Sequence, residues 1–305
     1  MPDEITVRLN GGLGNQLFQY AAGLGVANRL GCNLKLDVSR LENPDPGVTP
    51  RQFELGFLTK VPNIVRLPEP PALFNRIASS RHDWLANTSQ RLSRQFFEYG
   101  RRYDPRIEKI SPGTVLNGYF QSPMYFEGVK EQLLGELSDS SNSTVWFDEM
   151  KQQISSPDSV AIHVRRGDYL TQSPGSPHAP LGRDYYQCAL TQLKGHLKQH
   201  IYYIFSDDPD VQAADVGLDK EMVTIVKSPT NSPAIESLRL IAQARTIVTA
   251  NSSFSWWAGW LGSTRGEAKV LVPSPWYQDE AAGDLEILLN RSQVIEHVWN
   301  RNHVG

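Results

Sequence analysis

The sequence has few cysteines and no long apolar run. Its 305 residues include only Cys32 and Cys188, which lie far apart in the chain. Two such residues exclude a disulfide framework and a zinc-type spacing, so we expect a reducing compartment. No apolar run approaches the ~20 residues that a membrane helix needs. The chain becomes strand-like by Ile5, which leaves no room for a signal segment. These absences predict a cytoplasmic protein without a transmembrane segment.

The sequence also lacks a strong charge of either sign. Thirty Lys and Arg residues against 33 Asp and Glu residues leave a formal charge of -3. This balance argues against nucleic acid as a partner, although a local basic cluster can still bind a small anion. Hydrophobic residues make up 40% of the chain and charged residues 21%, which is typical of a globular protein with one or two cores.

Strand-like and helix-like segments alternate along the chain. The expected strands are 5–9, 33–38, 115–120, 159–164, 201–205, 246–249 and 270–272. The expected helices are 15–30, 124–137, 184–197, 232–244 and 254–261. Residues 42–71 are expected to be irregular, and residues 77–97 have a mixed pattern. The alternation predicts parallel sheets whose ligand sites lie beyond the carboxyl ends of the strands.

Two polar segments near the middle of the chain predict a domain boundary. They are residues 138–143 and 155–158, which are the least hydrophobic stretches there. We therefore expect an N-terminal domain over 1–154 and a C-terminal domain over 155–305.

The segment from His163 to Tyr169 concentrates charge at the expected end of a strand. It holds the adjacent arginines Arg165 and Arg166 and the carboxylate of Asp168. A guanidinium is always protonated and offers a planar fork of donors that fits phosphate oxygens. The segment thus predicts a diphosphate site. A surface ion pair between Arg166 and Asp168 is the simpler interpretation. One arginine is structural if the strand continues, since alternate side chains point to opposite faces.

A second polar segment, ANSSFSWW at 250–257, lies between an expected strand and an expected helix. Ser and Asn cap helices, and the backbone N–H groups at a helix start bind anions. The segment predicts a further phosphate contact, with ordinary capping as the alternative. Its tryptophans are expected to pack in the core.

The glycine-rich stretch 11–14 precedes Asn15 and Gln16 between the first strand and helix. Its spacing fits neither the G-x-G-x-x-G fingerprint nor the P-loop. The two amides are expected to face a cleft between the domains, where they would bind sugar hydroxyls or a phosphate. A tight turn capped by Asn is the alternative.

Acidic residues follow the strand expected at 201–205. Asp208 and Asp210 have a spacing that can hold a divalent cation. Asp and Pro after a strand also form a turn, which we favour because the arginine pair makes a metal redundant. Asp207 is expected to orient a ribose or base, and Glu236 can accept hydrogen bonds from a guanine edge or simply favour its helix start.

Four motifs together resemble the bacterial α-1,2-fucosyltransferase family, the GDP-fucose-dependent enzymes with an H-x-R-R-x-D element. They are NGGLGNQLFQYA, HVRRGDY, FSDDP and NSSFSWWAGWL, which span most of the chain in the family's order. The combination is highly specific, although each motif alone is weaker. The α-1,6- and protein O-fucosyltransferases share the H-x-R-R element more distantly.

The resemblance implies an α/β fold of GT-B type, with two Rossmann-like domains facing across a cleft. The donor would bind the C-terminal domain and the acceptor mainly the N-terminal one, with the C-terminal tail packing back on the first domain. Arg165 would bind the diphosphate of GDP-fucose. The other substrate-binding residues implied are Asn15, Gln16, His163, Arg166, Ser206, Asp207, Glu236, Asn251, Ser252, Ser253 and Phe254.

The expected reaction is inverting and requires no metal. It transfers L-fucose from GDP-fucose to the 2-hydroxyl of a terminal galactose in an oligosaccharide or glycolipid. Arg165 would assist the departing GDP and Asp168 would accept the hydroxyl proton. A lipid-linked acceptor would place the protein at the inner face of the membrane.

Two alternatives remain at this point. One is a metal-dependent glycosyltransferase of other specificity that uses Asp208 and Asp210. The other is a non-catalytic nucleotide- or carbohydrate-binding module, which the aromatic residues at 96–99 favour.

Overall fold

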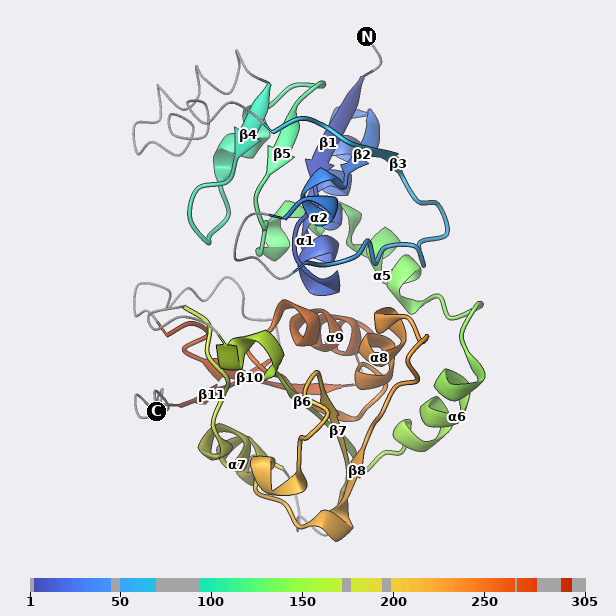
Figure 1. The fold of residues 1–305 in the computed structure, drawn as a ribbon, viewed down its shortest axis with the longest axis vertical. Helices are drawn as coiled ribbons and strands as arrows, with labels where there is room; N and C mark the ends of the chain where they lie inside the picture. Colours follow the sequence, from blue (N-terminus) through green and yellow to red (C-terminus); the bar gives the residue numbers. More distant parts are fainter. Residues whose placement is uncertain are drawn as a thin grey trace. The chain divides into compact units, whose positions relative to one another are not determined.

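A computed structural model describes residues 3–44, 50–69, 94–171, 177–193, 199–266, 268–278 and 292–297. The chain divides into two compact units between Glu136 and Leu137, and each has a sheet of its own (Figure 1). We call residues 1–136 unit 1 and residues 137–305 unit 2.

The described sheet of unit 1 is entirely parallel. Its strands are β1 (Glu4–Arg8), β2 (Asn33–Asp37), β3 (Asn63–Val65), β4 (Gln95–Phe97) and β5 (Val115–Asn117). They lie in the order β3-β2-β1-β5-β4. The order therefore reverses between β1 and β5, which is the topological switch point of this unit.

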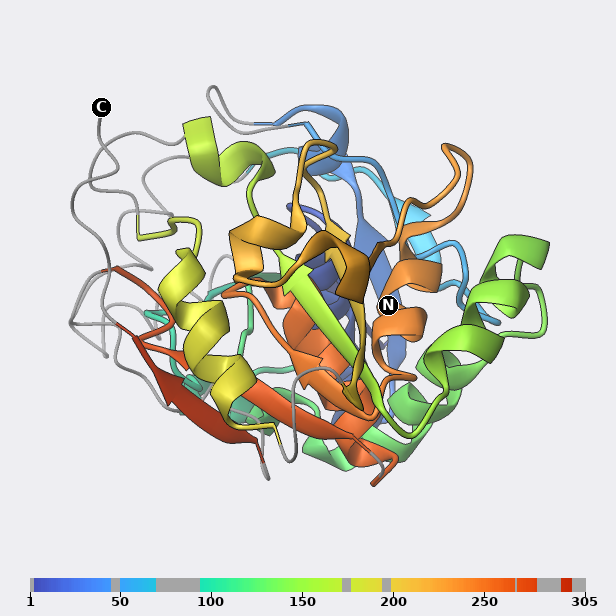
Figure 2. The same cartoon turned by 90° about the horizontal axis from the view of Figure 1, so that it is seen from below.

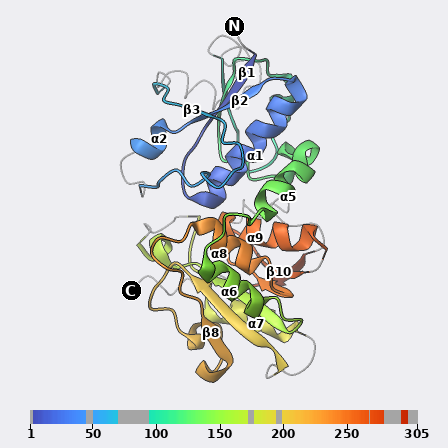
Figure 3. The same cartoon turned by 90° about the vertical axis from the view of Figure 1, so that its right-hand side faces the viewer.

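Helix α1 (Leu13–Leu30) packs against β1 and β2 (Figure 3). It ends at Gly31, whose φ of 64° is the left-handed conformation that glycine adopts readily. The other helices among the described residues of unit 1 are α2 (Ser39–Glu42), α5 (Lys130–Ser138) and 3-10 turns at Pro105–Lys109, Pro123–Tyr125 and Glu127–Val129. Helix α5 crosses the division between the units.

The described sheet of unit 2 is also parallel, in the order β11-β10-β9-β6-β7-β8. Its strands are β6 (Ser159–Val164), β7 (Ile201–Ser206), β8 (Val223–Ile225), β9 (Thr246–Val248), β10 (Lys269–Ser274) and β11 (Gln293–Glu296). All residues of β6 are buried, as expected of a strand covered on both faces. The order reverses between β6 and β9, so these two strands flank the switch point of unit 2.

Helices cover both faces of this second sheet. They are α6 (Val145–Ile154), α7 (Arg183–Thr191), α8 (Ala234–Ile241) and α9 (Ser253–Thr264). Helices α8 and α9 lie on one face and α7 on the other (Figures 1 and 2), while α6 packs beside α8 (Figure 3). Trp256 and Trp257 of α9 are fully buried, which confirms the prediction that they pack in the core.

The α/β class and the division into two Rossmann-like units, which the GT-B type requires, are confirmed by these two parallel sheets. Every strand expected from the sequence is present within a few residues. A cleft between the domains stays a prediction. The predicted packing of the C-terminal tail concerns residues 298–305, which lie outside the described residues.

Several short elements were not predicted. Strands β3, β4 and β8 have three residues each, of which at most one is buried, so they lack the apolar run of a core strand. The helix expected at 124–137 instead begins with two 3-10 turns, at Pro123–Tyr125 and Glu127–Val129. Within the parts of the chain that are described, no helix is both long and apolar enough to cross a membrane.

The two compact units divide earlier than the boundary predicted after residue 154. Helix α6 (145–154) packs against α8 and β6, so it belongs to unit 2. Only Phe147 and Ile154 of this helix are fully buried, which explains why the sequence around it resembled a linker.

Candidate active site

The polar motifs predicted from the sequence meet at the switch point of unit 2. Residues 165–168 follow β6, residues 207–208 follow β7, and residues 249–252 follow β9. Because β6 lies between β7 and β9, the three loops emerge side by side at the carboxyl edge of the sheet. Ligands of open α/β sheets bind at such an edge.

The Arg165 guanidinium contacts three side chains. One guanidinium nitrogen lies 2.7 Å from Asp207 Oδ2 and another forms an ion pair with Asp168. The guanidinium carbon lies 5.1 Å from the centroid of the Tyr169 ring. These contacts orient the guanidinium, which remains 19% exposed, so that a ligand can still reach it.

Arg166 has a structural role within unit 2. Its two terminal nitrogens contact the carboxylate of Asp215 at 2.9 and 3.0 Å, and one also lies 3.4 Å from Asp208. Asp215 accepts the backbone N–H of Gln212 at the start of a 3-10 turn. The two arginines thus have different partners. The alternative of an Arg166–Asp168 pair is wrong, because Asp168 pairs with Arg165.

Asp207 connects the loops after β6 and β7. Its Oδ1 accepts the backbone N–H of Arg166 at 2.9 Å while its Oδ2 contacts Arg165. The residue facing it is Gly167, where an added Cβ would collide with the Asp207 carboxylate. A glycine is therefore required at this position of the motif.

The segment after Asp207 forms the turn that we favoured. Ser206 Oγ accepts the N–H of Asp208 at 3.0 Å, and Asp208 Oδ1 accepts the N–H of Asp210 at the same distance. The other oxygen of Asp208 faces Arg166. Ser206 and Asp208 thus shape this loop.

His163 is the penultimate residue of β6, two residues before Arg165. It is 5% exposed, and its ring centroid is 5.4 Å from that of Phe254. Its buried Nδ1 has no hydrogen-bond partner among the described residues. Burial, and then the charge of Arg165, lowers the pKa of His163 from 6.5 to about 3. The imidazole ring is therefore neutral at pH 7 and does not add to the positive charge of Arg165 and Arg166.

We expect His163 to make unit 2 sensitive to acid. The unfolded histidine gains a proton near pH 6.5 whereas the folded one does not until about pH 3, so stability is retained above pH 6.5 and falls as the pH drops. Between pH 7 and pH 4 the unfolding free energy of the wild type should fall by about 3 kcal/mol more than that of His163→Phe. Urea unfolding at both pH values measures this difference. Equal pH dependence of the two proteins would contradict it.

Helix α9 begins at the same edge of the sheet. Its N-cap residue Ser252 accepts the N–H of Phe254 at 3.3 Å, and Ser253 is the first helical residue. Asn251 is 1% exposed and donates to the carbonyls of Ala179 and Trp276. The helix capping that we gave as the alternative interpretation of this segment is therefore present. The helix start nonetheless carries the partial positive charge that favours an anion.

Glu236 has a structural role that the sequence did not reveal. It is 2% exposed, and its two oxygens accept the backbone N–H of Thr144 at 2.7 Å and the Thr144 hydroxyl at 2.8 Å. Thr144 is the N-cap of α6. Glu236 therefore fixes α6 on unit 2. The guanine contact stays a prediction.

Asn15 and Gln16 of unit 1 differ in accessibility. Asn15 is half-buried, and its Oδ1 accepts a hydrogen bond from Gln121 at 3.0 Å. Gln16 is fully buried, and both ends of its amide are bonded to backbone groups of residues 11, 52 and 54. The expectation that both amides are exposed to a ligand therefore fails for Gln16.

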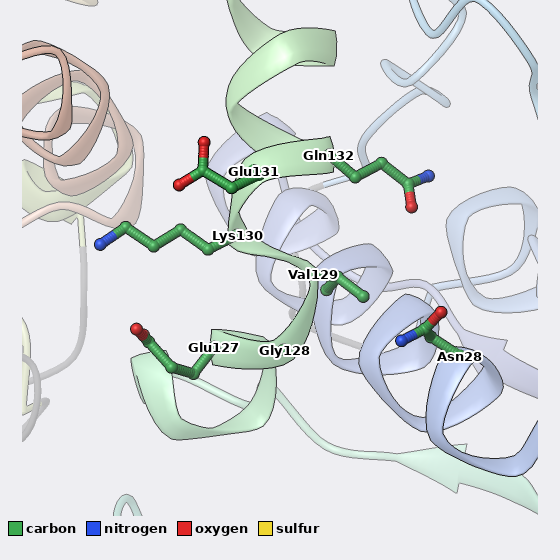
Figure 4. Close-up of a pocket in the computed structure, with 7 residues that line it drawn as sticks. All are labelled: Asn28, Glu127, Gly128, Val129, Lys130, Glu131 and Gln132. Carbon is green, nitrogen blue, oxygen red and sulfur yellow. The ribbon is translucent and has the colours of Figure 1, made fainter.

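A separate depression of about 330 Å³ lies in unit 1 (Figure 4). Its lining residues are Asn28, Glu127, Gly128, Val129, Lys130, Glu131 and Gln132. In Figure 4 the side chains of Glu131 and Gln132 point to opposite sides of their helix, so the polar groups do not converge. The depression lies beside α1 and α5 rather than at strand ends, and the chemistry predicted from the sequence is not found there.

Comparisons with known proteins agree with the motifs. The family model described as glycosyl transferase family 11 matches residues 93–290. An alpha-1,2-colitosyltransferase of Escherichia coli is 27% identical over 90% of this chain and 93% of its own length. A galactoside 2-alpha-L-fucosyltransferase of Caenorhabditis elegans is 27% identical over 86% of this chain and 70% of its own length. Among solved structures, the fucosyltransferase NodZ from Bradyrhizobium has 16% identity, a TM-score of 0.47 and coverage of 86% of this chain and 93% of that one.

Proposed function

The chain belongs to glycosyl transferase family 11, and on that premise we propose that it transfers L-fucose from GDP-fucose to the 2-hydroxyl of a terminal galactose. One observation carries the proposal. Arg165 is oriented by Asp168, Asp207 and Tyr169 at the switch point of unit 2, where α9 also begins. A guanidinium and a helix start at one edge are two groups suited to a diphosphate.

The 2-linkage is supported by what two relatives have in common. The names of the Escherichia coli and Caenorhabditis elegans proteins both specify an alpha linkage to position 2, while the transferred sugars differ. These two relatives thus share the position of the linkage, although they differ in the sugar that they transfer. Fucose and a galactoside acceptor are the donor sugar and acceptor of the second relative.

The reaction that we propose is a single displacement with inversion. The acceptor hydroxyl oxygen forms a bond to the anomeric carbon, the bond between that carbon and the diphosphate oxygen breaks, and GDP leaves with the electron pair. Charge grows on the diphosphate in the transition state, so Arg165 stabilises that state more than the bound donor. The hydroxyl proton passes to a carboxylate, for which the sequence predicts Asp168.

A test of this function combines donors and acceptors. The purified chain is incubated with GDP-fucose or with nucleotide-activated colitose, and with galactosides that carry a free or a methylated 2-hydroxyl. We expect fucosylated product, linked at position 2, only from acceptors with the free hydroxyl. Transfer of colitose alone, or at another position, would contradict the proposal.

The same assay addresses the two alternative functions. Turnover in EDTA separates our proposal from a glycosyltransferase that needs a metal at Asp208 and Asp210. A non-catalytic module would bind GDP without releasing it from GDP-fucose. We expect full turnover in EDTA, and its loss with recovery on addition of Mn²⁺ would favour the metal-dependent alternative.

A further inference from the structure

The sheet of unit 1 brings loops together in the same way as the sheet of unit 2. Strand β5 lies between β1 and β4, so the loops after these three strands emerge side by side at the carboxyl edge (Figure 1). The order of the strands reverses between β1 and β5. Ligands of open α/β sheets bind where the order reverses, so this edge is where we expect a ligand of unit 1.

Two exposed tyrosines follow neighbouring strands at this edge. Phe97 at the end of β4 is in register with Asn117 at the end of β5. Tyr99 and Tyr119 each lie two residues further along the chain, and their exposed fractions are 48% and 47%. An exposed tyrosine offers an apolar ring with a hydroxyl at its tip. The pair therefore suits a ligand that is itself part apolar and part polar, as a sugar ring is.

Amide side chains lie at the same edge. Asn10 Nδ2 is 3.4 Å from the Tyr119 hydroxyl, and Gln121 Nε2 donates to Asn15 Oδ1 at 3.0 Å. All three amides are half-buried, so a ligand can reach them. An amide carries two N–H donors and an oxygen that accepts twice, which allows it to bind a ligand hydroxyl as well as a protein partner. The hydroxyls of a sugar thus find both donors and acceptors here.

Two side chains hold the loops of this edge in place. Gln19 of α1 is 1% exposed, and its amide accepts the backbone N–H of Asn10 at 2.9 Å and donates to the carbonyl of Gly118 at 3.1 Å. Gln19 therefore joins the loop after β1 to the loop after β5. Glu98, which follows β4, accepts the backbone N–H groups of Tyr119 and of the next residue, both at 2.8 Å.

The backbone of the loop after β5 is strained. Phe120 has a φ of 53°, a left-handed conformation that is unfavourable for a residue with a side chain and persists where the surrounding structure fixes it. Its N–H is one of the two that Glu98 binds. Gly118 also lies against Glu98, since an added Cβ would be 2.5 Å from Glu98 Cβ. Strain of this kind clusters at binding sites, and a loop fixed in advance loses less entropy when a ligand binds.

The charge beside the glycine-rich stretch favours a neutral ligand. Glu54 accepts the backbone N–H of Leu13, the first residue of α1. It also lies beside Gly12, where an added Cβ would be 3.7 Å from Glu54 Oε2. The first turn of the helix has no acidic residue of its own. Glu54 therefore offsets the partial positive charge that would otherwise attract a phosphate to this helix start.

We propose that this edge of unit 1 binds a sugar ring through its two exposed tyrosines and its three half-buried amides. The residues are Tyr99, Tyr119, Asn10, Asn15 and Gln121, all of unit 1. The choice of a terminal galactose as the sugar rests on the proposed function, in which it is the acceptor. The binding itself involves unit 1 alone and can be measured without a donor.

The test is a titration of the full chain with methyl β-galactoside at pH 8, followed by ligand-observed NMR in the absence of nucleotide. Burial raises the pKa of Glu98 to about 7, so at pH 8 its carboxylate is largely charged and accepts both N–H groups strongly. Tyr119→Ala and Tyr99→Ala should each weaken binding by about threefold to tenfold, as expected for a lost aromatic contact. Tyr119→Phe keeps the ring and should lie between Tyr119→Ala and the wild type.

Ile64→Ala is the matched control. Ile64 is 43% exposed and belongs to β3, at the opposite end of the same sheet, so this variant should keep the affinity of the wild type. A thermal melt of each variant checks that it is folded. If Tyr119→Ala does not fold, Tyr119→Phe and Tyr99→Ala provide the comparison.

Wild-type affinity in the tyrosine variants would overturn the proposal. So would a wild-type protein that does not bind methyl β-galactoside, or one from which inorganic phosphate displaces it. The proposed function fails separately. A protein whose galactoside binding depends on the two tyrosines, but which forms no fucosylated product, would refute that function and leave the saccharide site standing.

Discussion

Replacing Arg165 by alanine is expected to lower kcat by about 10³-fold while the melting temperature changes by no more than about 2 °C. The guanidinium contacts Asp207 and Asp168 at a partly exposed edge, where an ion pair contributes little to stability. On a departing diphosphate the same group meets growing negative charge, so its removal acts mainly on the transition state. Steady-state kinetics with GDP-fucose and a thermal melt of the same preparation measure both effects.

Arg166 provides the matched control for that experiment. It neighbours Arg165 in the chain, but its guanidinium is bound to Asp215 and Asp208. Arg166→Ala should therefore change the melting temperature by a similarly small amount and lower kcat far less than Arg165→Ala. Arg165→Lys keeps the charge without the planar fork and should recover only part of the activity. A kcat near that of the wild type in Arg165→Ala would refute the leaving-group role.

Replacing Trp257 by alanine is expected to lower the free energy of unfolding by about 3 to 5 kcal/mol. The indole is fully buried on α9, and its ring lies 5.1 Å from that of Trp256 and 5.2 Å from that of Trp260. Its removal leaves a cavity under the helix that begins at the active-site edge. Since domains are stable by about 5 to 15 kcal/mol, much of the stability of unit 2 would be lost.

Urea unfolding followed by circular dichroism measures this loss. Val145→Ala is a suitable control, because Val145 is 74% exposed at the start of α6, and we expect a change within about 0.5 kcal/mol. Trp257→Phe keeps most of the volume and should have an intermediate effect. A loss below about 1 kcal/mol in Trp257→Ala would show that the surrounding core closes around the cavity.

The sequence by itself predicted the central strands of both sheets and the motifs that follow them, but not the edge strands β3, β4, β8 and β11. Buried parallel strands such as β6 are continuous apolar runs, and the polar residues that follow mark where each strand ends. The arginine loop after residues 159–164 and the capped helix after residues 246–249 could be located in this way. The positions of these strands and helices can be predicted because the periodicity of a strand or helix depends only on residues that are close together in the chain.

Only the tertiary structure decided which side chains meet. For Glu236 the sequence offered a guanine contact or a role at its helix start, and the structure adds a partner that neither predicted, Thr144, which lies 92 residues away in the chain. Arg166 is bound by Asp215 from a 3-10 turn with no recognisable motif, and Gln16 places Glu54 beside the glycine-rich stretch 11–14. Such partners come from segments that are distant in the sequence, and strand order brings them together. A sequence pattern specifies that a carboxylate is present, whereas the fold determines whether it binds the N-cap residue of a helix or orients an arginine.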